Sequence, residues 1–185
     1  MYEALNRLST SSLKDLEYLL NTRWGENDDE SMSSYFNGEP GKNLLILGTS
    51  PAAEISQSSY ADFDKYIEHI SLNYGAEYKI FYKGHPRYPS DETRKELFVN
   101  HNIVELPNSI PVETLMLLYP EVYVGGYYST SFLSSLKDQT IFFFGNKSFI
   151  SNNVAIANMF RDTDIFDQSV FLYKETDGSI GIENN

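Results

Sequence analysis

The sequence of 185 residues contains no cysteine. Disulfide bonds, thiolate catalysis and cysteine-ligated metals are therefore excluded, and a chain without disulfides fits the cytosol. The chain also has only three histidines and one tryptophan, so a histidine in a distinctive local sequence is a candidate for chemistry.

Positive charge is scarce, because 14 Lys and Arg stand against 26 Asp and Glu, for a formal net charge of −12. Nucleic-acid binding relies on Lys and Arg along phosphates, and anionic lipid repels an acidic chain, so neither partner is expected. No apolar run approaches the roughly 18 residues of a membrane span, and none resembles a secretory signal. We expect a cytoplasmic protein, either free or peripheral to the inner membrane. An anionic ligand would need a local cluster of positive charge.

From residue 43 onward the chain alternates apolar runs with amphipathic segments. Strands are predicted at 43–48, 78–84, 102–107, 121–126, 140–145 and 169–174, the last being a sixth strand or a sheet edge. Helices are predicted at 60–74, 90–100, 111–118, 129–136 and 152–160. Continuously apolar strands that alternate with helices are typical of a parallel sheet covered on both faces.

This pattern predicts an α/β protein with a Rossmann-like doubly wound parallel sheet. Residues 43–185 would form that domain, and residues 1–42 would form an N-terminal helix at 11–22 followed by an acidic loop. In such folds ligands bind beyond the carboxyl ends of the strands. The residues that follow each predicted strand are therefore the candidates for function.

The second predicted strand ends in Lys83-Gly84-His85-Pro86-Arg87. Glycine allows a ligand close to the backbone, and proline prevents the next helix from starting early. A histidine beside a phosphate can neutralise an oxygen that leaves with it. The alternative is a surface-loop histidine without a role.

The next two strands are followed by Glu113 and by Ser129, Thr130 and Ser131. The carboxylate could accept hydrogen bonds from a ribose diol, and hydroxyl and N–H groups at a helix start can bind an anion. The plainer alternatives are a helix-capping glutamate and a glycine turn with a serine cap. Together with His85, these residues could hold a base, a ribose and a phosphate.

Several other ligand classes are not supported by any motif. The G-x-G-x-x-G fingerprint and the phosphate-binding G-x-x-x-x-G-K-[ST] loop are both absent, so neither NAD nor a P-loop nucleotide is expected. His69 and His101 have no neighbours at metal-ligand spacing, so no metal is expected.

Three stretches, "YKGHPR", "LPNSIPVETL" and "VGGYYSTSFLSSL", together resemble the bacterial sialyltransferases of the GT-B fold. The resemblance is to the group with the Pasteurella and Photobacterium enzymes and covers about residues 43–175. In that family two Rossmann-like domains face each other across a cleft, and the C-terminal one binds the donor CMP-sialic acid. The resemblance implies metal-independent, inverting transfer of sialic acid to a sugar hydroxyl of lipooligosaccharide or capsule.

The resemblance also implies a role for each matching residue. His85 would contact the donor phosphate and assist the departure of CMP. The cytosine would meet Lys83 and Gly84, partly through backbone groups, and would pack near Ile110. Glu113 would bind the ribose. The phosphate would be held by Ser129 and Thr130, with Ser131 replacing one of them if the register shifts.

The chain departs from the family pattern in two places. The family's catalytic base is an aspartate of the N-terminal domain, and the 42 residues before the first predicted strand are too few for such a domain. The tryptophan that follows "GT" in some relatives is absent from "GTSPAAE". We therefore expect a donor-binding domain that is inactive alone, its glycan acceptor bound by a missing or separate domain. A homo-oligomer is compatible with the sequence.

Two other functions remain open from the sequence. One is a non-catalytic binding or interaction module on the same fold. The other is half of a GT-B glycosyltransferase that uses a different nucleotide sugar.

Overall fold

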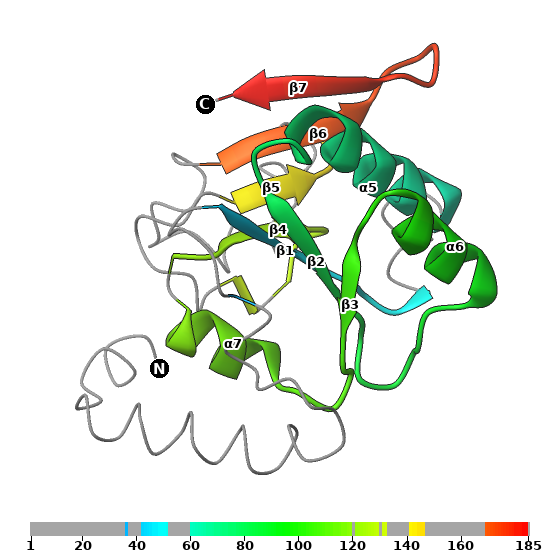
Figure 1. The fold of residues 1–185 in the computed structure, drawn as a ribbon. Helices are drawn as coiled ribbons and strands as arrows, with labels where there is room; N and C mark the ends of the chain where they lie inside the picture. Colours follow the sequence, from blue (N-terminus) through cyan, green and yellow to red (C-terminus); the bar gives the residue numbers. More distant parts are fainter. Residues whose placement is uncertain are drawn as a thin grey trace.

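The computed structural model describes residues 36, 42–51, 60–119, 121–129, 131–132, 141–146 and 169–184. Within them one seven-stranded sheet has the order β3-β2-β1-β4-β5-β6-β7 (Figure 1). All neighbouring pairs are parallel except β6 and β7. The strands are β1 (Asn43–Leu47), β2 (Lys79–Lys83), β3 (Val104–Leu106), β4 (Tyr123–Gly126), β5 (Ile141–Phe144), β6 (Ser169–Lys174) and β7 (Ile180–Asn184). The expected α/β class and mostly parallel sheet are confirmed.

The strands lie in the middle of the core, as their continuously apolar sequences predict. Every residue of β1 is buried, and its side chains alternate between two hydrophobic clusters. Leu45 and Leu47 belong to one cluster, while Leu44 and Ile46 belong to the other. Because neighbouring residues of a strand point to opposite faces, a strand that is apolar throughout must be covered on both.

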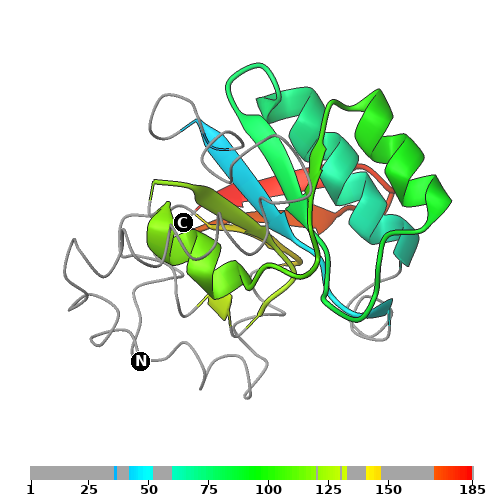
Figure 2. The same cartoon turned by 60° about the horizontal axis from the view of Figure 1, so that its bottom comes forward.

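Helices cover both faces of the sheet. Helices α5 (Tyr60–Tyr74) and α6 (Glu92–Asn100) lie on one face, where Phe63 and Ile67 of α5 pack against Leu44. Helix α7 (Val112–Leu118) lies on the other face, where Leu115 packs in the cluster of Leu45. Figure 2 shows α5 and α6 together on one side and α7 on the other.

Two predicted helix starts are shifted by local backbone preferences. Helix α6 begins at Glu92 because Asp91 caps it, its Oδ1 accepting the Arg94 N–H at 2.9 Å. Helix α7 begins at Val112, one residue later than predicted, because Pro111 has φ −66° and ψ 128° and precedes the helix as its N-cap. Glu113 is therefore the second helical residue, not the third.

The antiparallel edge strand β7 is absent from the prediction. Its signal is the Asp177-Gly178 pair, a common tight-turn sequence. Gly178 has a φ of +87°, and Asp177 Oδ1 accepts hydrogen bonds from the Ser179 N–H at 2.9 Å and hydroxyl at 2.6 Å. The turn folds the chain back so that β7 pairs with β6, which is the sixth strand but not the edge.

Some predictions fall outside the described residues. These are the helix at 11–22, the acidic loop, the helix at 152–160 and most of the helix at 129–136. The division of the chain at residue 43 stays a prediction. In the part of the chain that is described, no helix has both the length and the apolar sequence required to cross a bilayer.

The strand order creates a switch point between β1 and β4. From β1 the chain moves outward through β2 and β3, then returns to β4 on the opposite side of β1 and continues to β5 and β6 (Figure 1). At such a point the connections leave the sheet in opposite directions, which opens a crevice at the carboxyl ends of the strands. A functional site is expected there.

Candidate functional site

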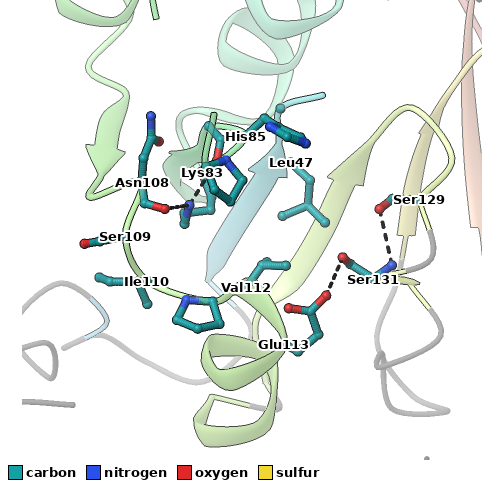
Figure 3. A pocket seen from close by; sticks show the side chains of 14 residues that line it. Leu47, Lys83, His85, Asn108, Ser109, Ile110, Val112, Glu113, Ser129 and Ser131 are labelled. Carbon is teal, nitrogen blue, oxygen red and sulfur yellow. Dashed lines mark hydrogen bonds between the residues drawn. The ribbon is translucent and has the colours of Figure 1, made fainter. Parts of the chain in front are cut away.

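A cavity of about 460 Å³ occupies this crevice (Figure 3). Its walls come from residues at the carboxyl ends of β1 and β2 and from residues that follow β1, β2, β3 and β4. Six residues proposed from the sequence line it together: Lys83, Gly84, His85, Ile110, Glu113 and Ser129, with Ser131 as a seventh. Thr130 lies outside the described residues. The remaining lining residues are Leu47, Gly48, Pro86, Asn108, Ser109, Pro111 and Val112.

Two glycines at the strand ends leave little room for a Cβ atom. Gly126 ends β4 with a φ of +139°, and a Cβ there would lie 2.6 Å from the Leu47 carbonyl oxygen of β1. At Gly84 a Cβ would lie 2.6 Å from Asn108 Oδ1. At Gly126 the neighbouring atom belongs to the backbone, so a larger residue would push β4 away from β1, whereas at Gly84 the Asn108 side chain would have to move.

Lys83 is the last residue of β2, and its side chain is buried with 3% of its surface exposed. The Nζ donates hydrogen bonds to the Gly84 carbonyl at 2.9 Å and the Asn108 carbonyl at 3.1 Å, which joins the end of β2 to the loop after β3. Burial lowers the pKa of Lys83 to about 8, opposed by the negative charges of Glu113 and Glu105. Lys83 therefore stabilises the cavity wall and places a cation in the described lining of the cavity.

His85 lies half-buried at the edge of the cavity, held by the turn that follows it (Figure 3). Its Nδ1 accepts the Arg87 backbone N–H at 3.2 Å, and its carbonyl accepts the Tyr88 N–H at 3.0 Å. The His85 ring also packs on the Tyr88 ring, with centroids 5.0 Å apart. Because Nδ1 is an acceptor here, the neutral imidazole carries its hydrogen on Nε2 and can donate it to a ligand.

Glu113 and Ser131 meet from different elements. The Ser131 hydroxyl, after β4, donates to Glu113 Oε1 of α7 at 2.7 Å. The Ser131 backbone N–H in turn donates to Ser129 Oγ at 3.2 Å. The serine that was proposed as an alternative phosphate ligand thus directs its hydroxyl at the glutamate proposed for ribose.

The loop after β3 supplies residues that the sequence analysis quoted but did not assign. Asn108 and Ser109 lie between Pro107 and Ile110, and a polar pair directly after a strand was the signal available. Asn108 Oδ1 is buried and, among the described residues, has no hydrogen-bond partner. Ile110 is buried beneath the loop and, with Val112 and Leu47, gives the cavity an apolar wall.

Among the described residues that line it, the cavity therefore combines an apolar wall with one carboxylate, one ammonium group, one imidazole, one amide and three serine side chains. An apolar wall suits the flat face of a base, and a carboxylate suits hydroxyl donors. N–H and O–H donors at the strand ends suit an anion.

The family model described as Sialyltransferase PMO188 matches residues 56–163. The chain belongs to this sialyltransferase family. The match contains every cavity residue except Leu47 and Gly48, and it confirms the membership predicted from the three sequence stretches. Among curated proteins no sequence matches the chain.

The fold is also found in a solved sialyltransferase. The α/β-galactoside α-2,3-sialyltransferase of Photobacterium phosphoreum superposes with a TM-score of 0.55 at 18% identity, over 92% of this chain and 46% of that one. The GT-B domain of the Photobacterium damselae sialyltransferase gives a TM-score of 0.47 at 14% identity, over 94% of this chain and 47% of that one. This chain therefore spans less than half the length of these structures.

Proposed function

We propose that this chain carries the donor-binding site of a bacterial sialyltransferase and binds the CMP part of CMP-sialic acid in the cavity. The observation that supports the proposal is the convergence of Lys83, His85, Glu113 and Ser129 on one cavity at the switch point of the sheet. These residues come from three separate strand ends, and they match the three stretches that carry the family resemblance.

Each part of the nucleotide has a counterpart in the cavity. The cytosine would pack near Ile110 and meet backbone groups of Lys83 and Gly84. The ribose diol would donate hydrogen bonds to Glu113.

The phosphate would lie between His85 Nε2 and the Ser129 hydroxyl, with Thr130 as a further predicted ligand. Ser129 Oγ accepts a hydrogen bond from the Ser131 N–H, so its own hydrogen is available for an anion.

In the proposed reaction, the acceptor hydroxyl oxygen attacks the anomeric carbon of sialic acid. The bond from that carbon to the phosphate oxygen breaks, and CMP leaves with the electron pair. His85 donates a hydrogen bond to the oxygen that gains charge, which favours its departure. The acceptor proton must pass to a base, and the resemblance assigns that base to the other domain of the family.

We therefore expect the 185-residue chain to bind the donor and to transfer little or no sialic acid by itself. The resemblance implies that the acceptor is a galactose of lipooligosaccharide or capsule. This acceptor would be bound by another domain. Binding is proposed to be independent of metal, so chelation with EDTA should leave the affinity for CMP unchanged.

The test is calorimetric titration of the chain with CMP, UMP and AMP. CMP should bind selectively, and His85→Ala and Glu113→Ala should each weaken it about 10- to 100-fold, as expected for the loss of a charge-assisted hydrogen bond. His101→Ala and Glu96→Ala remove the same side chains outside the cavity and should leave binding unchanged.

Other outcomes would favour the alternative functions. Equal or tighter binding of UMP would indicate a different nucleotide sugar. If His85→Ala left the affinity for all three nucleotides unchanged, the chain would be a binding module without this chemistry.

A further inference from the structure

Among the described residues that line the cavity, Ser131 is the one whose hydrogen bonds reach both the proposed phosphate and the proposed ribose subsites. Its hydroxyl donates to Glu113 Oε1 at 2.7 Å, and its backbone N–H donates to Ser129 Oγ at 3.2 Å (Figure 3). Ser129 and Ser131 belong to one segment and Glu113 to another, and Ser131 and Glu113 are 18 residues apart in the sequence. Ser131 thus ties the segment after β4 to the first turn of α7.

A glutamate at a cavity mouth is otherwise poorly fixed. Its terminal torsion is broad, and several rotamers would direct the carboxylate into solvent. Lys83, the cation that lines the cavity, donates hydrogen bonds to two backbone carbonyls, and within the described part of the chain no hydrogen bond or ion pair joins it to Glu113. In the part of the chain that is described, the Ser131 hydroxyl is the group that hydrogen-bonds the carboxylate and so restricts its orientation.

The hydrogen bond leaves the carboxylate able to bind a ligand. An ionised carboxylate has about four acceptor positions, and Ser131 uses one of them on Oε1. Oε2 keeps its full capacity for hydroxyl donors. A carboxylate oriented before the ligand arrives loses less conformational freedom on binding, which raises affinity.

We propose that Ser131 is a positioning residue that orients Glu113 for the ribose diol, a role that rests on the proposed nucleotide function. The hydroxyl itself does not contact the nucleotide in this assignment. Ser131 therefore matters only for ligands that carry the ribose hydroxyls. A residue that merely stabilised the fold would affect all ligands equally.

The experiment compares Ser131→Val with Ser131→Thr, two variants of nearly identical shape that differ in the hydroxyl. Each is titrated with CMP and with 2′,3′-dideoxy-CMP, which lacks both hydroxyls that Glu113 would accept. In the native chain CMP should bind at least about 10-fold more tightly than the dideoxy compound. Ser131→Val should weaken CMP about 5- to 10-fold and the dideoxy compound less than 2-fold, while Ser131→Thr should restore the native ratio.

Ser90→Ala is the matched control. Ser90 also donates its hydroxyl to a glutamate, Glu105 Oε1 at 2.6 Å, but it does not line the cavity. This variant should reduce thermal stability and leave the ratio of the two affinities unchanged.

The outcomes separate this proposal from the function on which it rests. No binding of CMP to the native chain, or equal binding of CMP and the dideoxy compound, would contradict the nucleotide or ribose assignment and with it the role of Ser131. A native preference for CMP that Ser131→Val leaves intact, or equal weakening of both ligands, would overturn the positioning role alone.

Discussion

A buried lysine at the end of a central strand has a cost that a surface lysine does not have. Lys83 is 3% exposed, and burial lowers its pKa from 10.5 to about 8. At neutral pH its ammonium form donates to the carbonyls of Gly84 and Asn108, which keeps the loop after β3 at the cavity. The site thus exchanges some stability for a fixed cation, since a buried charge is disfavoured without full compensation.

This cost predicts a specific pH dependence of stability. Between pH 8 and 10.5 the unfolded lysine is protonated while the folded one is largely neutral, so the unfolded state binds more protons and the free energy of unfolding rises with pH. From pH 7.5 to 9.5 the native chain should gain about 2 kcal/mol relative to Lys83→Met. Urea unfolding of both proteins at both pH values measures the difference. A constant difference would show that Lys83 is protonated throughout in the folded state.

At the scale of elements, the sequence predicted those helices and strands whose formation depends on the local pattern of residues. The six parallel strands and helices α5, α6 and α7 follow from continuous apolar runs, helical periodicity and capping residues. The end of a strand is also a local feature, so His85 and Glu113 could be placed at the cavity before the structure. The contact between Ser131 and Glu113 could not, because it depends on how the segment after β4 and the first turn of α7 meet in space.

The switch point itself provides a prediction for the β1–β4 pair. In Gly126→Ala the methyl group would lie 2.6 Å from the Leu47 carbonyl, and the φ of +139° is unfavourable for any residue with a Cβ. Strain and forced separation of the strands should together cost about 2–4 kcal/mol in urea unfolding. Because Leu47 lines the cavity, CMP affinity should fall as well.

Gly178→Ala is the control, because it introduces backbone strain without a steric clash of the new Cβ. Gly178 has a φ of +87°, but a Cβ there would meet nothing within 4 Å, and Gly178 does not line the cavity. It should cost only about 1 kcal/mol and leave CMP affinity unchanged. Equal losses in the two variants would mean that conformation alone, and not the approach to Leu47, requires glycine at position 126.

At the scale of the whole molecule, the ligand and the protein have the same sign of charge. The chain has a formal net charge of −12, and the phosphate of CMP adds about −1.5 to −2 near neutral pH. The proposed contacts between CMP and the cavity residues are short and partly buried, while the acidic groups that repel the phosphate are spread over the surface. Salt screens charges separated by more than about 10 Å at 0.1 M, so it should weaken the repulsion more than the contacts.

The affinity for CMP should therefore rise about 2- to 3-fold between 10 and 150 mM NaCl, against the usual trend for anion sites. Cytidine is the control ligand, because it keeps the base and ribose but has no charge, and its affinity should change little. Calorimetric titration of both ligands at the two salt concentrations measures the effect. A fall in CMP affinity with salt would show that local cations such as Lys83 dominate the field at the cavity, and that the acidic surface does not reach the ligand.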